Sequence, residues 1–241
     1  MMKIQTESNL LGIIQISGEN AAKFLQGQIT CDVNTLTEKN YNLAAHCDPK
    51  GRVQLSFHLL LRNDYYYLIL PRCMISHLHH CFDKYLPLYK IQLSDISEQC
   101  ELISTLPSAH IWTAQQIETG FSVIYPETKG LFTPHHLNYP ALGVVSFNKG
   151  CYVGQEIVAR MHYLGAPIKK NLYRINFAHS VQLKPGTIIY AGALSIGKLL
   201  FSTLCADMHY QALACLQTDQ ISHTLHLDSP YGISIDNWTS L

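Results

Sequence analysis

The sequence predicts an α+β fold in which an antiparallel sheet with helices is followed by a small C-terminal β-barrel or sandwich. Hydrophobic residues make up 47% of the 241 residues and charged residues only 14%, which excludes a disordered chain. Apolar, strand-like segments in the first third of the chain are joined by tight turns, as in an antiparallel meander. After residue 165, short apolar segments alternate with Gly, Pro and Asp, a pattern typical of small all-β modules.

Five strands are expected in the first 94 residues. The turn sequences Asp48–Gly51 and Arg62–Asp64 join three of them into the meander, because Asp, Asn, Pro and Gly favour the backbone angles of tight turns. From the N-terminus, the expected strands are Leu10–Ile16, Asn42–Cys47, Val53–Leu61, Tyr65–Leu70 and Ile91–Leu93.

Two helices are expected between these strands. Ser17 is expected to cap the first, over residues 19–28, because a serine hydroxyl accepts a hydrogen bond from a free N–H group in the first turn of a helix. Apolar residues recur at helical spacing from Met74 to Leu86, which predicts the second helix. Pro87 is expected to end it, since proline lacks an N–H group and clashes with the preceding turn.

A second region begins near Asp95. Ile111–Thr119 is expected to form a helix that ends at Gly120, since glycine readily adopts the left-handed conformation found at helix C-termini. Gln155–Tyr163 is expected to form another helix, and Gly165–Pro167 marks a boundary. Beyond it, the expected strands are Leu172–Phe177, Thr187–Tyr190, Leu194–Leu199, Gln211–Leu216 and a last one near Ile221–Leu227.

These boundaries predict three domains: residues 1–94, a second α+β domain over residues 95–165, and a β-barrel over residues 166–241. The N-terminus lacks the basic start and long apolar core of a signal peptide, and no apolar run approaches 18 residues. A cytoplasmic protein without a membrane segment is therefore expected. The chain carries 17 Lys and Arg against 17 Asp and Glu, so its net charge excludes few classes of partner.

Eight cysteines are spread along the chain without a CxxC pair, which argues against a disulfide framework. The densest group of cysteines and histidines runs from Cys73 to Cys81, where His77 and Cys81 are the only pair well spaced to share a metal. A half-exposed amphipathic helix is the favoured interpretation of this segment. No metal site is therefore expected.

The segment Asn148–Arg160 carries the strongest chemical pattern. Cys151 follows Lys149 and Gly150 and lies just ahead of the helix that begins near Gln155. A cation and a helix N-terminus both favour a thiolate, so a nucleophilic or metal-competent thiol is one interpretation. A buried structural cysteine at a tight glycine turn is the other.

Basic residues are also concentrated in this part of the chain. The window from Lys149 to Arg174 holds five basic residues and the single acid Glu156, a net charge of +4, which leaves −4 for the rest of the chain. Such a window suits an anionic partner such as a phosphate, a polyglutamate or an RNA backbone. A solvated surface with a charged linker explains it equally well.

The segment Lys149-Gly-Cys-Tyr-x-Gly-Gln-Glu-Ile-Val-Ala-Arg160 resembles the motif of the YgfZ family of folate-binding proteins, which are relatives of the glycine-cleavage T protein, an aminomethyltransferase. Further blocks resemble that family in the same order along the chain. They are Gly18–Asp32, Ala44–Arg52, Trp112–Phe121 and Phe132–Asn138.

The resemblance implies a T-protein-like ring of two α+β domains with antiparallel sheets and a C-terminal β-barrel, with tetrahydrofolate in the central channel. It also implies a role in assembling or repairing iron–sulfur clusters in client enzymes, including enzymes that modify tRNA. The implied partners are therefore folate and iron–sulfur client enzymes, with an indirect link to tRNA.

The resemblance also assigns residues. Cys151 corresponds to the motif cysteine of the family, and Lys149 stands beside it as the second expected catalytic residue. Trp112 and Leu11 stand at folate-associated positions, where some relatives have an aromatic residue in place of Leu11. Glu118 matches the T-protein carboxylate that pairs with the pterin. That role is chemically reasonable, because a carboxylate can accept two parallel N–H bonds from the pterin ring. The motif loop is expected to be shaped by Gly150, Tyr152, Gly154, Gln155, Glu156 and Arg160.

One departure from the T protein bears on activity. Leu55 and Ser56 stand where the T protein carries an acidic pair, so the chain lacks the carboxylate that serves aminomethyl transfer as a general acid–base. We therefore expect no aminomethyltransferase activity, which weakens the alternative of a tetrahydrofolate-dependent one-carbon transferase. A second alternative is direct tRNA binding through the basic window, with Tyr152, Tyr163 and Tyr173 as the only aromatic residues available for stacking.

Overall fold

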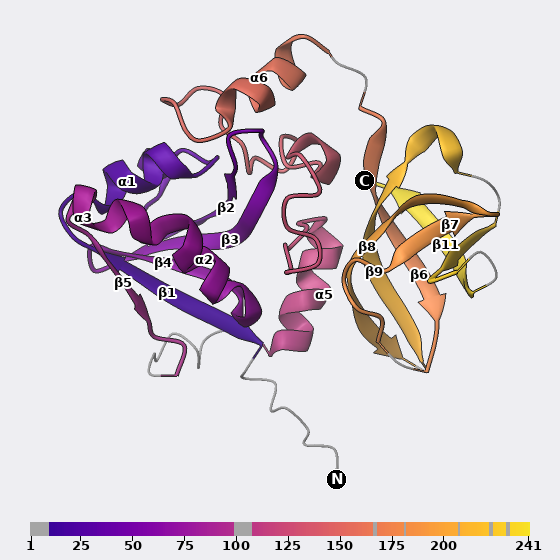
Figure 1. Ribbon diagram of the computed structural model, residues 1–241. Coiled ribbons are helices and arrows are strands. Elements are labelled where there is room, and N and C mark those ends of the chain that lie inside the picture. Colours follow the sequence, from indigo (N-terminus) through magenta and orange to yellow (C-terminus); the bar gives the residue numbers. More distant parts are fainter. Residues whose placement is uncertain are drawn as a thin grey trace.

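The structure is a computed structural model that describes residues 10–98, 108–165, 168–180, 182–206, 208–221, 224–229 and 232–241. It consists of a five-stranded sheet with helices, a central segment of helices and loops, and a closed C-terminal barrel (Figure 1). The predicted α+β class is therefore confirmed. Cys100, most of the predicted boundary at Gly165–Pro167 and part of the strand predicted near Ile221–Leu227 lie outside the described residues.

The N-terminal sheet is antiparallel, with the strand order β2-β3-β4-β1-β5. All five predicted strands are present, with their ends shifted by at most two residues. Alternation along β3 places Leu55 and Phe57 toward one face of the sheet and Ser56 and His58 toward the other. The strands are β1 (Leu11–Ser17), β2 (Tyr41–Cys47), β3 (Val53–Arg62), β4 (Tyr65–Pro71) and β5 (Gln92–Asp95).

Two details of the first helices differ from prediction. Helix α1 (Ala21–Gln28) begins after Asn20, so the predicted cap by Ser17 is wrong: Ser17 ends β1, and Gly18, at φ 117°, turns the chain first. The predicted second helix is divided, from its N-terminus, into η3 (Arg72–Met74), α2 (Ile75–Phe82), η4 (Asp83–Tyr85) and α3 (Leu86–Tyr89).

The prediction that Pro87 ends a helix is wrong. Pro87 lies in the first turn of α3. Proline is accepted at that place because the N–H groups of a first turn have no partner within the helix. Helix α3 instead ends at Lys90, which adopts the left-handed conformation at φ 52°.

The central segment agrees closely with prediction at its helices. Helix α5 (Ala109–Thr119) is capped by the Ser108 side chain and ends at Gly120, whose φ of 77° is the predicted left-handed conformation. Helix α6 (Gln155–Tyr163) has the predicted bounds. From residue 108 to residue 165 the described chain forms helices and loops without a strand, including the short 3-10 helix η5 (His135–Leu137).

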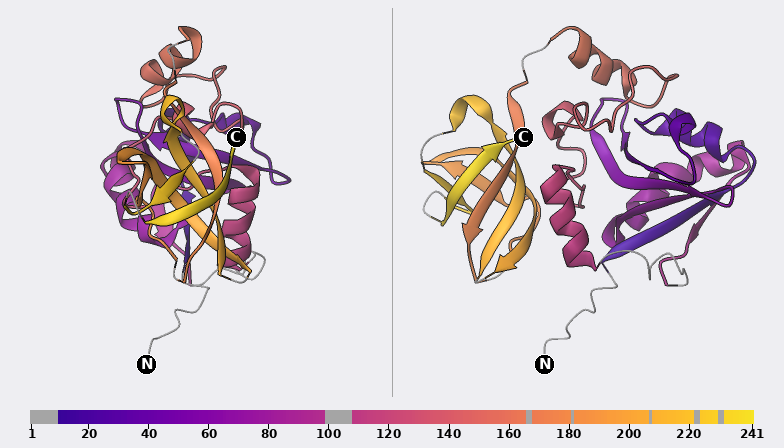
Figure 2. Two further views of the ribbon diagram at one scale, coloured as in Figure 1. Left: turned by 90° about the vertical axis from the view of Figure 1, so that its right-hand side faces the viewer. Right: turned by 180° about the vertical axis from the view of Figure 1, so that it is seen from behind.

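Helix α5 lies between the sheet and the barrel, as Figures 1 and 2 both show. On the sheet side, the ring of His58 hydrogen-bonds the side chain of Gln116 at 2.9 Å. On the barrel side, the guanidinium of Arg174 donates to the backbone carbonyls of Ile117 and Glu118 in the last turn of α5. A cation at this end of a helix is favoured by the helix dipole, so Arg174 stabilises the contact between α5 and the barrel.

The C-terminal strands close into a barrel with the order β10-β11-β6-β9-β8-β7, which confirms the predicted β-module as a barrel. Strand β8 continues seven residues beyond its predicted end at Leu199, and β11 was not predicted, because its sequence ISIDNWTS is largely polar. The strands are β6 (Lys170–Ala178), β7 (Ile188–Ala191), β8 (Leu194–Ala206), β9 (His209–Gln217), β10 (Leu225–Leu227) and β11 (Ile233–Ser240).

The buried histidine His46 predicts a dependence of stability on pH. Its Nδ1 donates to the carbonyl of Gln28 at 2.8 Å, and burial lowers its pKa to about 4. Between pH 6.5 and pH 4 the unfolded chain binds a proton at this residue that the folded chain does not, so stability falls as pH falls through that window. This one residue should cost about 2 kcal/mol between pH 7 and pH 5.

Urea unfolding of wild type and His46→Gln at pH 7 and pH 5 measures this effect. The loss of unfolding free energy on acidification should be about 2 kcal/mol smaller in His46→Gln, whereas the exposed control His80→Gln should lose as much as wild type. Equal losses in all three proteins would show that His46 is not held neutral in the folded state.

Candidate functional site

The motif loop, residues 149–154, is anchored where α1 ends. The Lys149 ammonium donates to the carbonyls of Ile29 at 2.7 Å and Cys31 at 2.8 Å, and it lies 5.2 Å from the ring centroid of Tyr152. Burial lowers the pKa of Lys149 to about 8, although nearby Cys31 and Asp32 oppose the shift. Lys149 therefore stabilises the backbone that follows α1, which is a structural task.

The other end of the loop packs on the turn between β2 and β3. Gly154 precedes α6 with φ 84°, and a Cβ there would overlap the carbonyl oxygen of Asp48 and lie 3.0 Å from Cβ of Cys47. A Cβ added to Gly51, in the turn itself at φ 69°, would lie 3.0 Å from Cβ of Ile157 in α6. Only glycine allows these two backbone segments to approach each other this closely.

The residues of the motif divide into two groups. Tyr152 is 6% exposed, and its backbone N–H donates to the side chain of Gln155, so both residues hold the loop in place. Burial raises the pKa of the Tyr152 hydroxyl. Cys151, Glu156 and Arg160 are exposed, so the arrangement presents the thiol at the surface of a loop whose backbone is held on both sides.

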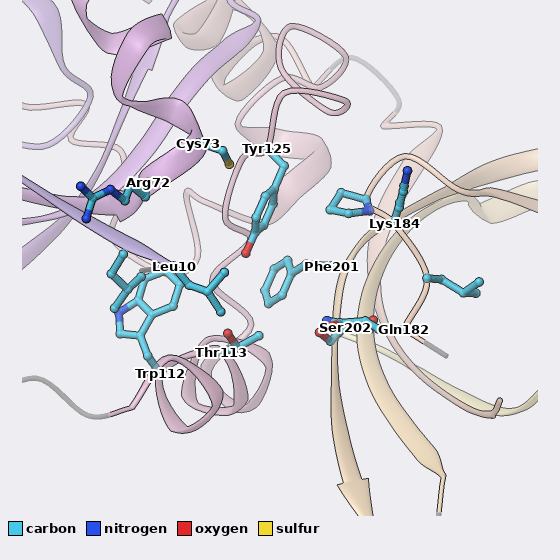
Figure 3. Close-up of a pocket in the computed structure, with 13 residues that line it drawn as sticks. Leu10, Arg72, Cys73, Trp112, Thr113, Tyr125, Gln182, Lys184, Phe201 and Ser202 are labelled. Carbon is cyan, nitrogen blue, oxygen red and sulfur yellow. Dashed lines mark hydrogen bonds between the residues drawn. The ribbon is translucent and has the colours of Figure 1, made fainter. Parts of the chain in front are cut away.

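A cavity of about 520 Å³ lies between the start of β1, the start of α5 and the barrel. Figure 3 shows Trp112, Tyr125 and Phe201 arranged around it. The Trp112 side chain is 4% exposed and shares the cavity wall with Leu11, so the structure brings these two predicted folate residues together. The walls are mainly aromatic and aliphatic with a few polar groups, which is typical of a small-molecule site.

Two predicted site residues lie elsewhere. Glu118 is exposed at the far end of α5, does not line the cavity, and offers its backbone carbonyl to Arg174. Cys151 does not line the cavity either. The predicted residues thus form two separate places, one with Trp112 and Leu11 and one with Cys151.

Several cavity residues were not predicted. Tyr125 comes from the loop after α5, and Gln182, Lys184 and Phe201 come from the barrel. These residues reach the cavity because the barrel packs against the N-terminal part of the chain. No short motif marks them, so local sequence patterns could not have identified them.

Comparison with curated proteins gives relatives named tRNA-modifying protein YgfZ. The relative from Colwellia psychrerythraea is 30% identical, with 70% of each chain covered, and the one from Escherichia coli is 27% identical, with 90% of each chain covered. The chain belongs to the YgfZ family. No protein-family model matches the chain.

The solved structures add a likeness in fold. The glycine cleavage system aminomethyltransferase T from Bartonella henselae matches this YgfZ-family chain with a TM-score of 0.63, covering 97% of this chain and 83% of the other. The sequences are only 10% identical, so the likeness concerns the fold alone. The predicted T-protein-like fold is thereby confirmed.

The positions of the T protein's acidic pair are filled by packing in this YgfZ-family chain. Leu55 is fully buried in the core. The Ser56 hydroxyl accepts from the N–H of Ile124 at 2.9 Å and donates to the carbonyl of Ser122 at 3.3 Å. Neither residue lines the cavity, and neither offers a carboxylate for acid–base chemistry.

The cysteines and histidines of the described chain do not gather into a metal site. Within residues 10–98, 108–165 and the described barrel, no group of three or more His, Cys, Asp or Glu could hold a metal. Sγ of Cys81 lies 3.7 Å from Nε2 of His77. The seven described cysteines are free thiols. In the same residues, no helix is long and apolar enough to span a bilayer.

The contact of Gly154 with the β2–β3 turn predicts a sharp difference between two glycines of the motif. Gly154→Ala should destabilise the protein by about 3 kcal/mol, because the new Cβ meets the Asp48 carbonyl and the residue is held at positive φ. Gly150→Ala, with open space around it, should change stability by less than about 0.5 kcal/mol. Thermal or urea unfolding measures both, and equal effects would contradict the described contact.

Proposed function

We propose that this YgfZ-family protein binds tetrahydrofolate or a derivative in the cavity of about 520 Å³ and supports iron–sulfur enzymes, including enzymes that modify tRNA. The observation that carries the proposal is that Trp112 and Leu11, both at folate-associated positions of the family, line one cavity. The names of the relatives support the tRNA part of the proposal.

The residues of the cavity fit a folate. Its volume lies within the usual range of about 300–1,000 Å³ for small-molecule sites. Trp112, Tyr125 and Phe201 provide aromatic walls for a flat heterocycle, and Lys184 lies on the lining with a positive charge suited to a glutamate carboxylate. A bound tetrahydrofolate supplies one-carbon chemistry, while these residues bind and orient it.

The exposed position of Cys151 supports contact with a macromolecular client. Cys151 does not line the cavity, and an exposed thiol on a well-anchored loop can reach the surface of a partner. Folate and Cys151 then act at different places in the molecule. Leu55 and Ser56, which offer no carboxylate, speak against the alternative of aminomethyl transfer.

Folate binding is tested by fluorescence, because the chain has only two tryptophans. In Trp238→Phe, tetrahydrofolate at micromolar concentration should still produce a saturable change, which then comes from Trp112 alone. Trp112→Phe should lose that change and bind about 10-fold or more weakly by calorimetry, since part of a buried aromatic contact is removed. No saturable signal in wild type or Trp238→Phe would overturn the folate proposal.

The role of the thiol is tested separately. Cys151→Ser should fail to restore the activity of an iron–sulfur enzyme that modifies tRNA in a strain lacking this protein, while retaining wild-type folate binding. Cys205→Ser, another exposed thiol, should restore that activity fully. Full restoration by Cys151→Ser would show that the thiol is not required.

A further inference from the structure

A second hollow, of about 210 Å³, lies on the outer surface of the barrel beside Leu131 and Phe132. Two of the residues that line it, Lys170 and Lys198, are cationic, and Gln217 adds an amide. No Asp or Glu is among its described lining residues. We call this hollow the lysine cleft; it shares no lining residue with the cavity that contains Trp112.

The strand register places the two lysines on one face. Lys170 of β6 pairs with Gln217 of β9, and Lys198 of β8 pairs with Cys215 of β9. Residues two apart in a strand share a face, so all four side chains project to the same side of the sheet. Cys215 shows which side this is: its thiol lies 3.6 Å from the carbonyl of His136, outside the barrel.

A third cation lies at the margin of the lysine cleft. The Arg52 guanidinium donates to the carbonyl of Leu131 at 3.0 Å, and Leu131 lines the cleft. The Lys198 ammonium donates a hydrogen bond to the carbonyl of Gly186 at 3.1 Å. In the described chain, none of Arg52, Lys170 and Lys198 forms an ion pair with a carboxylate, so their charges remain available to an anion.

The structure places the basic residues of the window Lys149–Arg174 in different surroundings. Lys149 and Arg174 each donate to two backbone carbonyls, whereas Lys198 and Arg52 each donate to one and keep their other N–H groups for a ligand. Lys170 lines the cleft, and Lys169 beside it is exposed. Arg160 is also exposed, on α6, so Lys169 and Lys170 are the two basic residues of the window that lie at or beside the lysine cleft.

We propose that the lysine cleft binds a phosphate group of an RNA backbone. Lysine ammonium groups around a small hollow suit a compact, strongly charged oxyanion, and the volume accommodates one phosphate but not a folate. The proposal rests on the tRNA part of the proposed function and is independent of folate binding. It assigns RNA a direct contact with this protein.

Base stacking contributes little to this contact. Tyr152 and Tyr173 are each only 6% exposed, so their rings cannot receive a base, and Tyr163 is the only one of the three tyrosines at the surface. Recognition by the lysine cleft is therefore electrostatic, tolerant of sequence and sensitive to salt.

The test is fluorescence anisotropy of a labelled, unmodified tRNA transcript with the full-length protein between 50 and 200 mM NaCl. Over this range each phosphate contact loses about a factor of three in affinity. The double variant K170Q/K198Q should bind about 10-fold or more weakly at the lowest salt. Its slope of log affinity against log salt should be smaller by about 2, one for each phosphate-directed lysine removed. The matched control K23Q/K39Q, which removes two exposed lysines elsewhere, should keep more of both the affinity and the slope.

Three outcomes would overturn the proposal. The double variant and the control could lose affinity equally, or wild type could fail to bind tRNA at the lowest salt. Finally, wild type could fail to bind tRNA while inorganic phosphate perturbs the NMR signals of wild type but not those of K170Q/K198Q. That result would identify the ligand as a small phosphate compound.

Folate titration of the same proteins separates the two proposals. K170Q/K198Q should bind tetrahydrofolate as wild type does, because the cleft and the cavity share no residue. If wild type does not bind folate but the lysine effect on tRNA persists, the folate proposal fails and the lysine cleft stands.

Discussion

The close approach of Gly154 to the turn between β2 and β3 is the constraint on which the functional surface depends. Two backbone segments meet there without a side chain between them, so the start of α6 is fixed relative to the sheet. Lys149 adds a second attachment at the end of α1. Cys151 lies between these two attachments, and its exposure is therefore a consequence of how its neighbours are held.

Helix α5 joins the two halves of the molecule and thereby creates the cavity. Its first turn supplies Trp112, its middle contacts β3 through Gln116, and its last turn receives Arg174 from the barrel. The cavity exists because β1, α5 and β8 meet at one place. Its lining consequently draws on residues from Leu10 to Ser202, and its composition follows from the docking of the barrel.

Local physics explains which parts of the fold were predictable. The alternating apolar residues at the start of β3, the tight turns on either side of β3 and the left-handed Gly120 at the end of α5 are short-range features, and the structure has them as predicted. The polar strand β11 depends on its neighbours in a closed barrel, which no local pattern records. The direction of the Lys149 side chain and the distance of Glu118 from the cavity depend likewise on tertiary packing.

The separation of Cys151 from the cavity has a thermodynamic consequence. A ligand that binds beside Trp112 without touching Cys151 can affect events at the thiol only through a coupling free energy carried by the intervening protein. Such coupling is reciprocal: if a bound folate strengthens the docking of a client at Cys151 by some factor, the docked client strengthens folate binding by the same factor. Occupancy of the cavity and engagement of the loop are then two readouts of one equilibrium.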